Sequence, residues 1–260
     1  MFNHLLAPKR KPGMTDDDAR LAAILPPVGH RIPAPPLTDT LLAPFRTARL
    51  LAYFFKRKPI LEKLTLGSPA MRDEMHAVLA RMGITVEVHG FENLQAGGQV
   101  LMWNQTSHLD HPVLAEAIPV PFRSTYNVEV SKFPIYGDWL RRQNHYFIDR
   151  FNEAQWRASL AEAAAWVRSG GTVTVSPEGT RSWDGTLLPM KRGSFILAIQ
   201  SGQPIVPVVV RGAHEALPRG RFTVKPGLVT VTFGKPISTE GYTEESRKPL
   251  EERVAEALRS

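Results

Sequence analysis

The sequence predicts an α/β domain with a mostly parallel sheet and helices on both faces, preceded by an N-terminal basic amphipathic helical segment. From Ile84 onward, short apolar patterns typical of strands alternate with patterns of helical period. Two of the strand patterns, residues 172–175 and 205–210, are β-branched runs typical of strands covered on both faces. The 260 residues, 43% of them apolar and 22% charged, fit one large α/β domain with a helical extension rather than two full domains.

Residues 1–38 are predicted to form a flexible, proline-rich tail. Six prolines stand among few periodic apolar positions in and just after the second half of this tail: Pro26, Pro27, Pro33, Pro35, Pro36 and Pro44. Residues 39–83 form the predicted N-terminal helical segment, and residues 84–260 form the predicted α/β domain.

A basic amphipathic helix is predicted over residues 38–64, where Lys and Arg side chains outnumber the acidic residues Asp39 and Glu62. Two interpretations of this helix have equal weight. It is either an ordinary helix that packs on its own domain, or a helix that lies on a membrane surface. Phe54 and Phe55 beside basic residues suit the headgroup boundary of a membrane.

The remaining elements follow from changes of period and from helix-end signals. A helix predicted over residues 69–82 begins with Pro69 and ends before Gly83. Strands are predicted over residues 84–89, 100–103, 122–130, 172–175 and 205–210. Helices are predicted over residues 109–117, 134–142, 153–169 and 244–259. Two further strands, residues 221–226 and 229–233, are predicted to form a hairpin through Pro226 and Gly227.

Composition restricts the chemistry and the partners. The chain has no Cys, which excludes disulfides, thiolate nucleophiles and Cys-based metal sites. A formal net charge of +7 favours an anionic partner, which is nucleic acid, an anionic lipid surface or a phosphorylated substrate. The N-terminal third has no apolar stretch near the roughly 20 residues of a membrane span, and the N-terminus lacks the pattern of a secretory signal. We therefore expect a cytoplasmic protein.

Three polar loops lie where a ligand site is expected. Residues 104–112 and residues 176–182 each follow a buried strand directly, and ligands bind at this edge of open α/β sheets. In the second loop, Gly179 permits close backbone approach and Arg181 offers a forked donor that matches phosphate. Residues 191–195 begin a helix whose free N–H groups add a further anion site.

The first loop also has a purely structural interpretation. Ser107 is expected to cap the following helix, which places His108, Asp110 and His111 in its first turn. An aspartate there is stabilised by the helix dipole, so Asp110 has an alternative role as a capping residue.

Taken in order, these loops resemble the sequence blocks of the glycerolipid acyltransferase family, which acylates glycerol 3-phosphate and 1-acylglycerol 3-phosphate. The resemblance spans roughly residues 86–235. The family's Asn-His-x-Ser-x-x-Asp block falls on residues 104–110, and its Phe-Pro-Glu-Gly-Thr-Arg-Ser block falls on residues 176–182. The two other blocks fall on residues 132–137 with 147–150, and on residues 191–195 with 204–207. Four blocks in one order are hard to obtain by chance.

The resemblance implies an O-acyltransferase of phospholipid biosynthesis that moves a fatty acyl group from acyl-CoA or acyl-carrier protein to a hydroxyl of a glycerol-phosphate or lysolipid acceptor. It implies that Asp110 organises the catalytic loop and that Glu178, Gly179, Thr180 and Arg181 bind the acceptor, with Arg181 on its phosphate. No cofactor and no metal are expected, since thioester acyl transfer needs only a base, an oxyanion site and positioning. The expected location is peripheral, at the anionic inner face of the membrane.

Two positions depart from the family pattern. The family's general base is a His five positions before the Asp, and Gln105 stands there. An amide cannot take the proton, and general acid–base help contributes a factor of about 10² to 10⁴ in rate. Asn127 stands where the family often has a Lys for the acceptor's phosphate. His108 is a candidate for a replacement base, and His111 is a weaker one because Pro112 follows it.

Two other hypotheses stay open at this point. In the first, the protein is a catalytically impaired lipid-binding or regulatory member of the same family, in which Gln105 holds a substrate hydroxyl. The second, nucleic-acid binding, rests only on the positive charge and lacks any recognised motif, so no nucleic-acid partner is expected. If Arg181 does not bind the phosphate, Lys191 and Arg192 are the next candidates.

Overall fold

The structure is a computed structural model and describes residues 56–57, 60–61, 63–133, 136–221 and 223–260. The predicted tail and most of the predicted basic helix lie outside these residues, so both stay predictions. Within the described ranges, no helix is long and apolar enough to cross a membrane.

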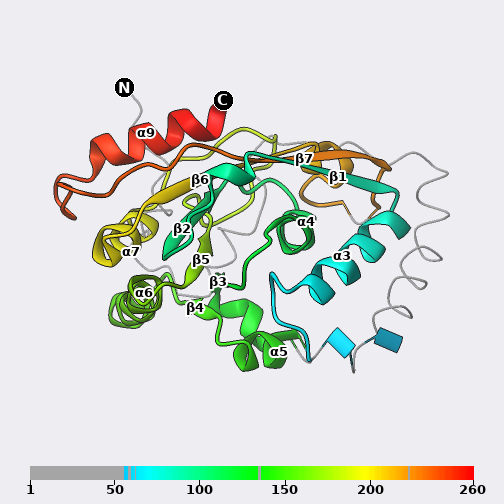
Figure 1. Cartoon of the computed structure of the whole chain (residues 1–260), viewed down its shortest axis with the longest axis horizontal. Helices are drawn as coiled ribbons and strands as arrows, with labels where there is room; N and C mark the ends of the chain where they lie inside the picture. Colours follow the sequence, from blue (N-terminus) through cyan, green and yellow to red (C-terminus); the bar gives the residue numbers. More distant parts are fainter. Residues whose placement is uncertain (1–55, 58–59, 62, 134–135, 222) are drawn as a thin grey trace, which may run out of the picture.

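A seven-stranded sheet runs through the molecule in the order β1-β7-β6-β2-β5-β3-β4 (Figure 1). Its strands are β1 (Ile84–His89), β2 (Gln99–Trp103), β3 (Phe122–Asn127), β4 (Tyr146–Ile148), β5 (Thr172–Val175), β6 (Ile205–Arg211) and β7 (Gly227–Phe233). Neighbouring strands are parallel except for β6 and β7, which are antiparallel. The prediction of a mostly parallel sheet is therefore confirmed.

Helices cover both faces of this sheet, as predicted (Figure 1). They are α3 (Pro69–Arg81), α4 (Asp110–Ala117), α5 (Tyr136–Arg142), α6 (Glu153–Arg168), α7 (Arg192–Ser201), α8 (Ala213–Ala216) and α9 (Lys248–Arg259). Along β2, Leu101 and Trp103 join the core formed with α3 and α4, whereas Val100 and Met102 join the core formed with α6, α7 and α9. The alternation of side chains along a strand thus divides the apolar residues between two cores.

The predicted hairpin over residues 221–226 and 229–233 is wrong. Residues 223–226 do not form a strand, and β7 pairs in parallel with β1 and antiparallel with β6. Pro226 has no N–H for a ladder hydrogen bond. It packs instead on Gly83, where an added Cβ would lie 2.8 Å from the Cβ of Pro226. The chain therefore enters the sheet directly at Gly227.

Other short elements and element ends also differ from the prediction. Strand β4 was not expected, because three residues are too few to show a period. Strand β3 ends at Asn127, and the residues after it form a short 3-10 helix, η2 (Val128–Lys132); another, η1 (Phe91–Asn93), follows β1. Helix α9 begins at Lys248 rather than residue 244, because Thr243 N–H donates to Ser246 Oγ in a turn (2.8 Å).

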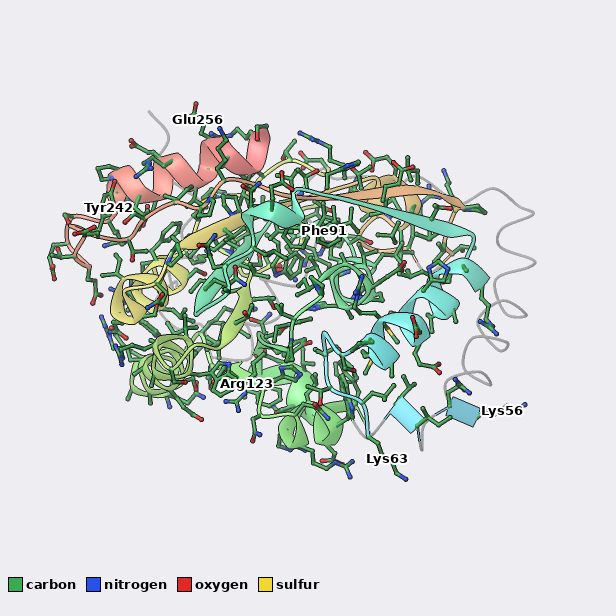
Figure 2. All side chains as sticks on the ribbon, in the orientation of Figure 1. Lys56, Lys63, Phe91, Arg123, Tyr242 and Glu256 are labelled. Atoms are coloured by element: carbon green, nitrogen blue, oxygen red, sulfur yellow. The ribbon has the colours of Figure 1, made fainter. Side chains whose placement is uncertain are left out.

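Three of the cations that are labelled in Figure 2 belong to segments other than the predicted loops. Arg123 of β3 lies 3.9 Å from the ring centroid of Trp166 and donates to the hydroxyl of Tyr146 (3.0 Å). Lys56 and Lys63 extend from the chain that precedes α3, at one end of the molecule (Figure 2). These three cations are not part of the site described below.

Gly98 packs directly against the end of α6. A Cβ at Gly98 would lie 1.9 Å from the carbonyl oxygen of Val167, whereas a Cβ at Gly97 would meet nothing within 4 Å. We expect Gly98→Ala to lower the free energy of unfolding by about 1–3 kcal/mol, because the overlap forces a backbone shift. The matched control Gly97→Ala should leave it unchanged or raise it slightly. Urea unfolding followed by circular dichroism measures both variants, and equal stabilities would contradict this packing.

Candidate active site

The loops after β2 and β5 meet at the carboxyl edge of the sheet, where the sequence placed them. The two strands are parallel neighbours, so their ends lie side by side. Ser182 N–H donates to the carbonyl oxygen of Gln105 (2.9 Å), and Gln105 N–H donates to Oε1 of Glu178 (2.7 Å). Residues 73 and 77 positions apart in the chain are thus joined directly by hydrogen bonds.

Asp110 is completely buried at the start of α4. Its Oδ2 accepts the N–H groups of Thr106 and Ser107, both at 2.8 Å. Its Oδ1 is buried and has no hydrogen-bond partner among the described residues. Burial raises the pKa of Asp110 to about 7, although the two N–H groups act in the opposite direction. The carboxylate therefore holds the loop with one oxygen and leaves the other unoccupied.

The expected helix cap differs in detail. Helix α4 begins at Asp110, with Leu109 as the residue before it, and no side chain caps it. Ser107 Oγ accepts from Leu109 N–H (3.0 Å) and donates to the carbonyl oxygen of Leu217 (2.8 Å). The Asp110 carboxylate thus binds the loop that precedes α4 and not the first turn of α4 itself.

Gln105 does not replace the missing histidine as a partner of Asp110. Its side-chain amide makes no hydrogen bond with another described residue, and Oδ1 of Asp110 has no hydrogen-bond partner among them either. A neutral amide has no basic nitrogen, so Gln105 can hold a hydroxyl group but cannot deprotonate it.

His108 is exposed on the surface of the same loop. Desolvation of the covered part of the ring, and then the positive charges of Arg181 and Arg219, lower its pKa to about 4. The imidazole is therefore neutral at pH 7 and keeps a free lone pair. His111 is enclosed instead, stacked on Tyr126 (5.1 Å between ring centroids) and edge-on to Trp103 (5.2 Å), which withdraws it from the surface.

Glu178 holds the two loops together. Its Oε1 accepts from Gln105 N–H (2.7 Å) and its Oε2 from Leu188 N–H (2.6 Å), and the side chain is 1% exposed. Burial raises its pKa to about 7. Because both oxygens accept hydrogen bonds from backbone groups, Glu178 positions the two loops, and its expected contact with the acceptor stays a prediction.

Four cations gather around the loop of residues 176–182. Arg150 donates to the carbonyl oxygen of Gly179 (3.3 Å), and Arg219 donates to the carbonyl oxygen of Arg181 (2.7 Å) and to Thr180 Oγ1 (3.4 Å). Arg219 is also stacked on the ring of Trp183, at 4.1 Å from the centroid.

The charges of this group repel one another. Burial, and then Arg181 and Arg150, lower the pKa of Arg219 to about 10, while burial and Arg150 lower that of Lys191. The Arg181 guanidinium has no hydrogen-bond or ion-pair partner among the described residues, and burial lowers its pKa as well. We call Arg150, Arg181, Lys191 and Arg219 the cation cluster. A bound anion would relieve its repulsion.

Sequence reasoning found part of this cluster. Arg181 and Lys191 were candidates, and the structure brings both together. Arg192, the other candidate, is not part of the cation cluster, because it pairs with Glu153 (3.0 Å) and lies over the ring of Trp156. Arg219 was missed, since it follows the short helix α8 and belongs to no motif. Only the order of the strands brings it to the loop after β5.

Among the described residues, no group of three His, Asp or Glu side chains is arranged to hold a metal ion.

Comparison with known proteins identifies relatives of this domain. An acyltransferase family model matches residues 85–211. A 1-acyl-sn-glycerol-3-phosphate acyltransferase of Limnanthes alba is 35% identical over 162 residues, which are 62% of this chain and 57% of that protein. The enzyme of the same name from Saccharomyces cerevisiae is 31% identical over 186 residues, 70% of this chain and 61% of that protein. The chain thus spans about three fifths of the length of these curated relatives.

A solved structure has the same architecture. It is the 1-acyl-sn-glycerophosphate (LPA) acyltransferase PlsC from Thermotoga maritima, which aligns with a TM-score of 0.63 and 26% sequence identity. The alignment covers 86% of this chain and 92% of that one.

The raised pKa of Asp110 makes stability depend on pH. Its ordinary pKa is 3.8 and its pKa in the folded protein is about 7, so the folded protein binds this proton more tightly than the unfolded chain does. The resulting stability is present below about pH 4 and is lost as the pH rises to about 7. Asp110→Asn keeps an oxygen for the two backbone N–H groups and removes the titration.

We expect the free energy of unfolding of the wild type to fall more steeply between pH 4.5 and 8 than that of Asp110→Asn. The difference should reach a few kcal/mol, since one pKa unit corresponds to about 1.4 kcal/mol. Denaturant unfolding at several pH values measures it. Glu178, whose charge also raises the pKa of Asp110, is present in both proteins. Parallel pH profiles would contradict the buried state of this carboxylate.

Proposed function

We propose that the protein transfers a fatty acyl group from an acyl thioester to a hydroxyl of a glycerol-phosphate or lysolipid acceptor. The match of residues 85–211 to the acyltransferase family model and the similarity to the named acyltransferases support this proposal. The observation that carries the proposal is the cation cluster beside the Asp110 loop. A phosphorylated acceptor that binds there would have its hydroxyl next to the position of the family's base.

The cluster supports a phosphate rather than a carboxylate as the bound group. Four cations come from four separate segments, and a phosphate offers oxygens in several directions. Asn127, which stands in place of a family Lys, weakens one side of such a site. Arg150 and Arg219 supply positive charge on the side of the loop after β5.

The reaction needs one proton transfer. The acceptor oxygen attacks the carbonyl carbon of the thioester, a C–O bond forms and the C–S bond breaks. The proton of the hydroxyl passes to a base and finally to the departing thiolate. In this chain the base cannot be Gln105, and Oδ1 of Asp110 is buried.

We assign the base to His108. Its imidazole is neutral at pH 7, although a pKa of about 4 makes it a weak base. A phosphate on Arg181 and Arg219 would offset the positive charges that help to hold this pKa down. Acceptor binding would therefore move the pKa of His108 towards neutrality and strengthen the base when it is needed.

The same arrangement suits a protein that binds the lipid without turning it over. Gln105 would then hold the acceptor hydroxyl, and the cation cluster would hold its phosphate. The variants below separate these two cases. No metal or cofactor enters either of them.

We also propose that the protein acts in the cytoplasm, peripherally on an anionic membrane surface, because its acceptor and product are lipids and its net charge is +7. Flotation with anionic and with neutral vesicles tests this location. Equal flotation with both would contradict it.

Arg181→Ala should raise the KM of a phosphorylated acceptor about 10-fold or more and leave the KM of the acyl donor nearly unchanged, because a charge-assisted pair to phosphate is lost. Arg181→Lys should rescue only in part, since an ammonium lacks the fork. Arg192→Ala is the matched control, because this arginine pairs with Glu153 outside the site. Thiol release from acyl-CoA at varied acceptor concentrations measures each constant. Equal effects of Arg181→Ala and Arg192→Ala would move the phosphate away from the cluster.

Gln105→His and His108→Ala identify the base. If His108 is the base, the wild type is active, His108→Ala loses about 10²-fold or more in kcat, and Gln105→His adds little. If instead the wild type has very low activity and Gln105→His raises kcat by a factor of about 10² to 10⁴, the base is missing and the rest of the site is intact. Acyl transfer to lysophosphatidate, followed by product analysis, measures both. Inactivity of the wild type and of Gln105→His with every donor would favour the lipid-binding role.

A further inference from the structure

Exposed apolar side chains gather on one side of the molecule. Among the described residues, the large apolar side chains that are exposed are Ile60, Phe91, Phe133, Tyr136 and Leu228. Phe133 has the largest exposed fraction of these, 61%. Single exposed apolar residues are common on soluble proteins, whereas a group of them marks a contact surface. Phe91 packs on Phe233 (5.8 Å between ring centroids) and Leu228 extends from β7, but the other three lie together.

Helix α5 brings Ile60, Phe133 and Tyr136 together. The N–H of the residue after Tyr136 donates to the carbonyl oxygen of Phe133 (2.8 Å), so one helical turn separates the two rings. The ring of Tyr136 is stacked on that of Trp139 (6.0 Å between centroids). Trp139 Nε1 donates to the carbonyl oxygen of Leu61 (3.1 Å), which places the neighbouring Ile60 beside α5.

Cations surround these apolar side chains. Lys132, Arg141 and Arg142 are exposed. The acids of the same segment are Asp138, which is bound to Arg141, and the half-buried Glu129. The segment is therefore positively charged at neutral pH. We call the following residues the α5 surface: Ile60, Lys132, Phe133, Tyr136 and Arg142.

This combination of side chains suits the headgroup region of an anionic bilayer. Aromatic rings that carry cations beside them place the rings at the boundary of the acyl chains and the cations on the lipid phosphates. Each Lys or Arg near such a surface adds to the attraction. Lys63 extends from the chain beside α5 and adds a further positive charge on this side (Figure 2).

A row of aromatic side chains connects the α5 surface with the Asp110 loop. The hydroxyl of Tyr136 is hydrogen-bonded to that of Tyr126. The ring of Tyr126 is stacked on His111 (5.1 Å between ring centroids), which directly follows Asp110 in the first turn of α4. The exposed surface and the buried carboxylate thus lie at the two ends of one packed row.

We propose that the α5 surface is the face with which the protein rests on an anionic bilayer. Phe133 and Tyr136 lie among the lipid headgroups, and Lys132 and Arg142 bind lipid phosphates. The inference rests on the proposed function, whose acceptor and product are lipids. A lysolipid in that bilayer would approach the Asp110 loop from the side of Tyr136.

Partition of the full chain onto vesicles tests the apolar part of the surface. Phe133→Ser should weaken binding to vesicles of phosphatidylglycerol and phosphatidylcholine about 5- to 20-fold, because the ring no longer leaves water. Leu228→Ser is the matched control, since Leu228 is 49% exposed on β7, near the opposite edge of the sheet from β3 and β4. The predicted basic helix over residues 38–64 is intact in both variants. Equal binding of the two variants would overturn the inference.

Lys132→Gln tests the charged part. It should weaken binding to the phosphatidylglycerol vesicles about 3- to 5-fold at low salt, and the difference should disappear at high salt because the attraction is screened. Lys235→Gln is the control, an exposed lysine that follows β7. An equal loss in both variants would assign the attraction to the net charge of the protein and overturn the role of the α5 surface.

A single label shows directly which face meets the lipid. The chain has no Cys, so Phe133→Cys and Leu228→Cys each provide one site for a fluorescent thiol label. With phosphatidylglycerol vesicles, the label at position 133 should be quenched by spin-labelled lipid and protected from iodide in the water. The label at position 228 should stay open to iodide. Equal access of iodide to both labels would contradict the proposed orientation.

The remaining outcomes separate this surface from other partners and from the proposed reaction. A dimer of the wild type that Phe133→Ser dissociates, with unchanged vesicle binding, would assign the surface to a second copy and overturn the inference. Turnover of lysophosphatidate in vesicles with the label at position 133 open to iodide would refute the surface and leave acyl transfer standing. Lipid contact at position 133 in a protein without turnover would support the surface and refute acyl transfer.

Discussion

One buried carboxylate holds the reactive surface together. Glu178 follows β5, and its two oxygens bind Gln105 N–H after β2 and Leu188 N–H at the far end of its own loop. Burying a carboxylate costs free energy, which is expressed in its raised pKa of about 7. The two backbone hydrogen bonds offset that cost only while both loops are in place. The loop with Gln105 and Asp110 and the loop with Arg181 are therefore held as one unit.

This joint surface explains why like charges can be tolerated beside it. Arg219 and Arg150 bind carbonyl oxygens of the loop after β5, which anchors their guanidinium groups close to Arg181. Their hydrogen bonds and the stacking of Arg219 on Trp183 stabilise the empty site against part of the repulsion. The remaining repulsion favours a bound anion, so the proposed phosphate site depends on the same contacts that build the loop.

The Asp110 loop has the geometry of an orienting carboxylate without the group that it would orient. One oxygen is saturated by two N–H groups, and the other has no partner among the described residues. The Gln105 amide makes no hydrogen bond to this oxygen. Within residues 104–110, Gln105 is the position that departs from the Asn-His-x-Ser-x-x-Asp pattern. In the proposed function, the identity of the base therefore decides whether acyl transfer is efficient.

The sequence alone determined the class of fold, the central strands and the two loops at the carboxyl edge. These features follow from local patterns. Apolar residues that recur every two residues in a strand or every 3.6 residues in a helix, and a polar run after a buried strand, are properties of neighbouring residues. The sequence also identified Gln105, Asp110 and Arg181 as candidate site residues. Tertiary structure decided what depends on strand order: the pairing of β7 with β1 and the arrival of Arg219 beside Arg181. It also decided the role of Glu178, because a motif shows that a carboxylate is present, whereas only the fold brings two distant N–H groups to its oxygens.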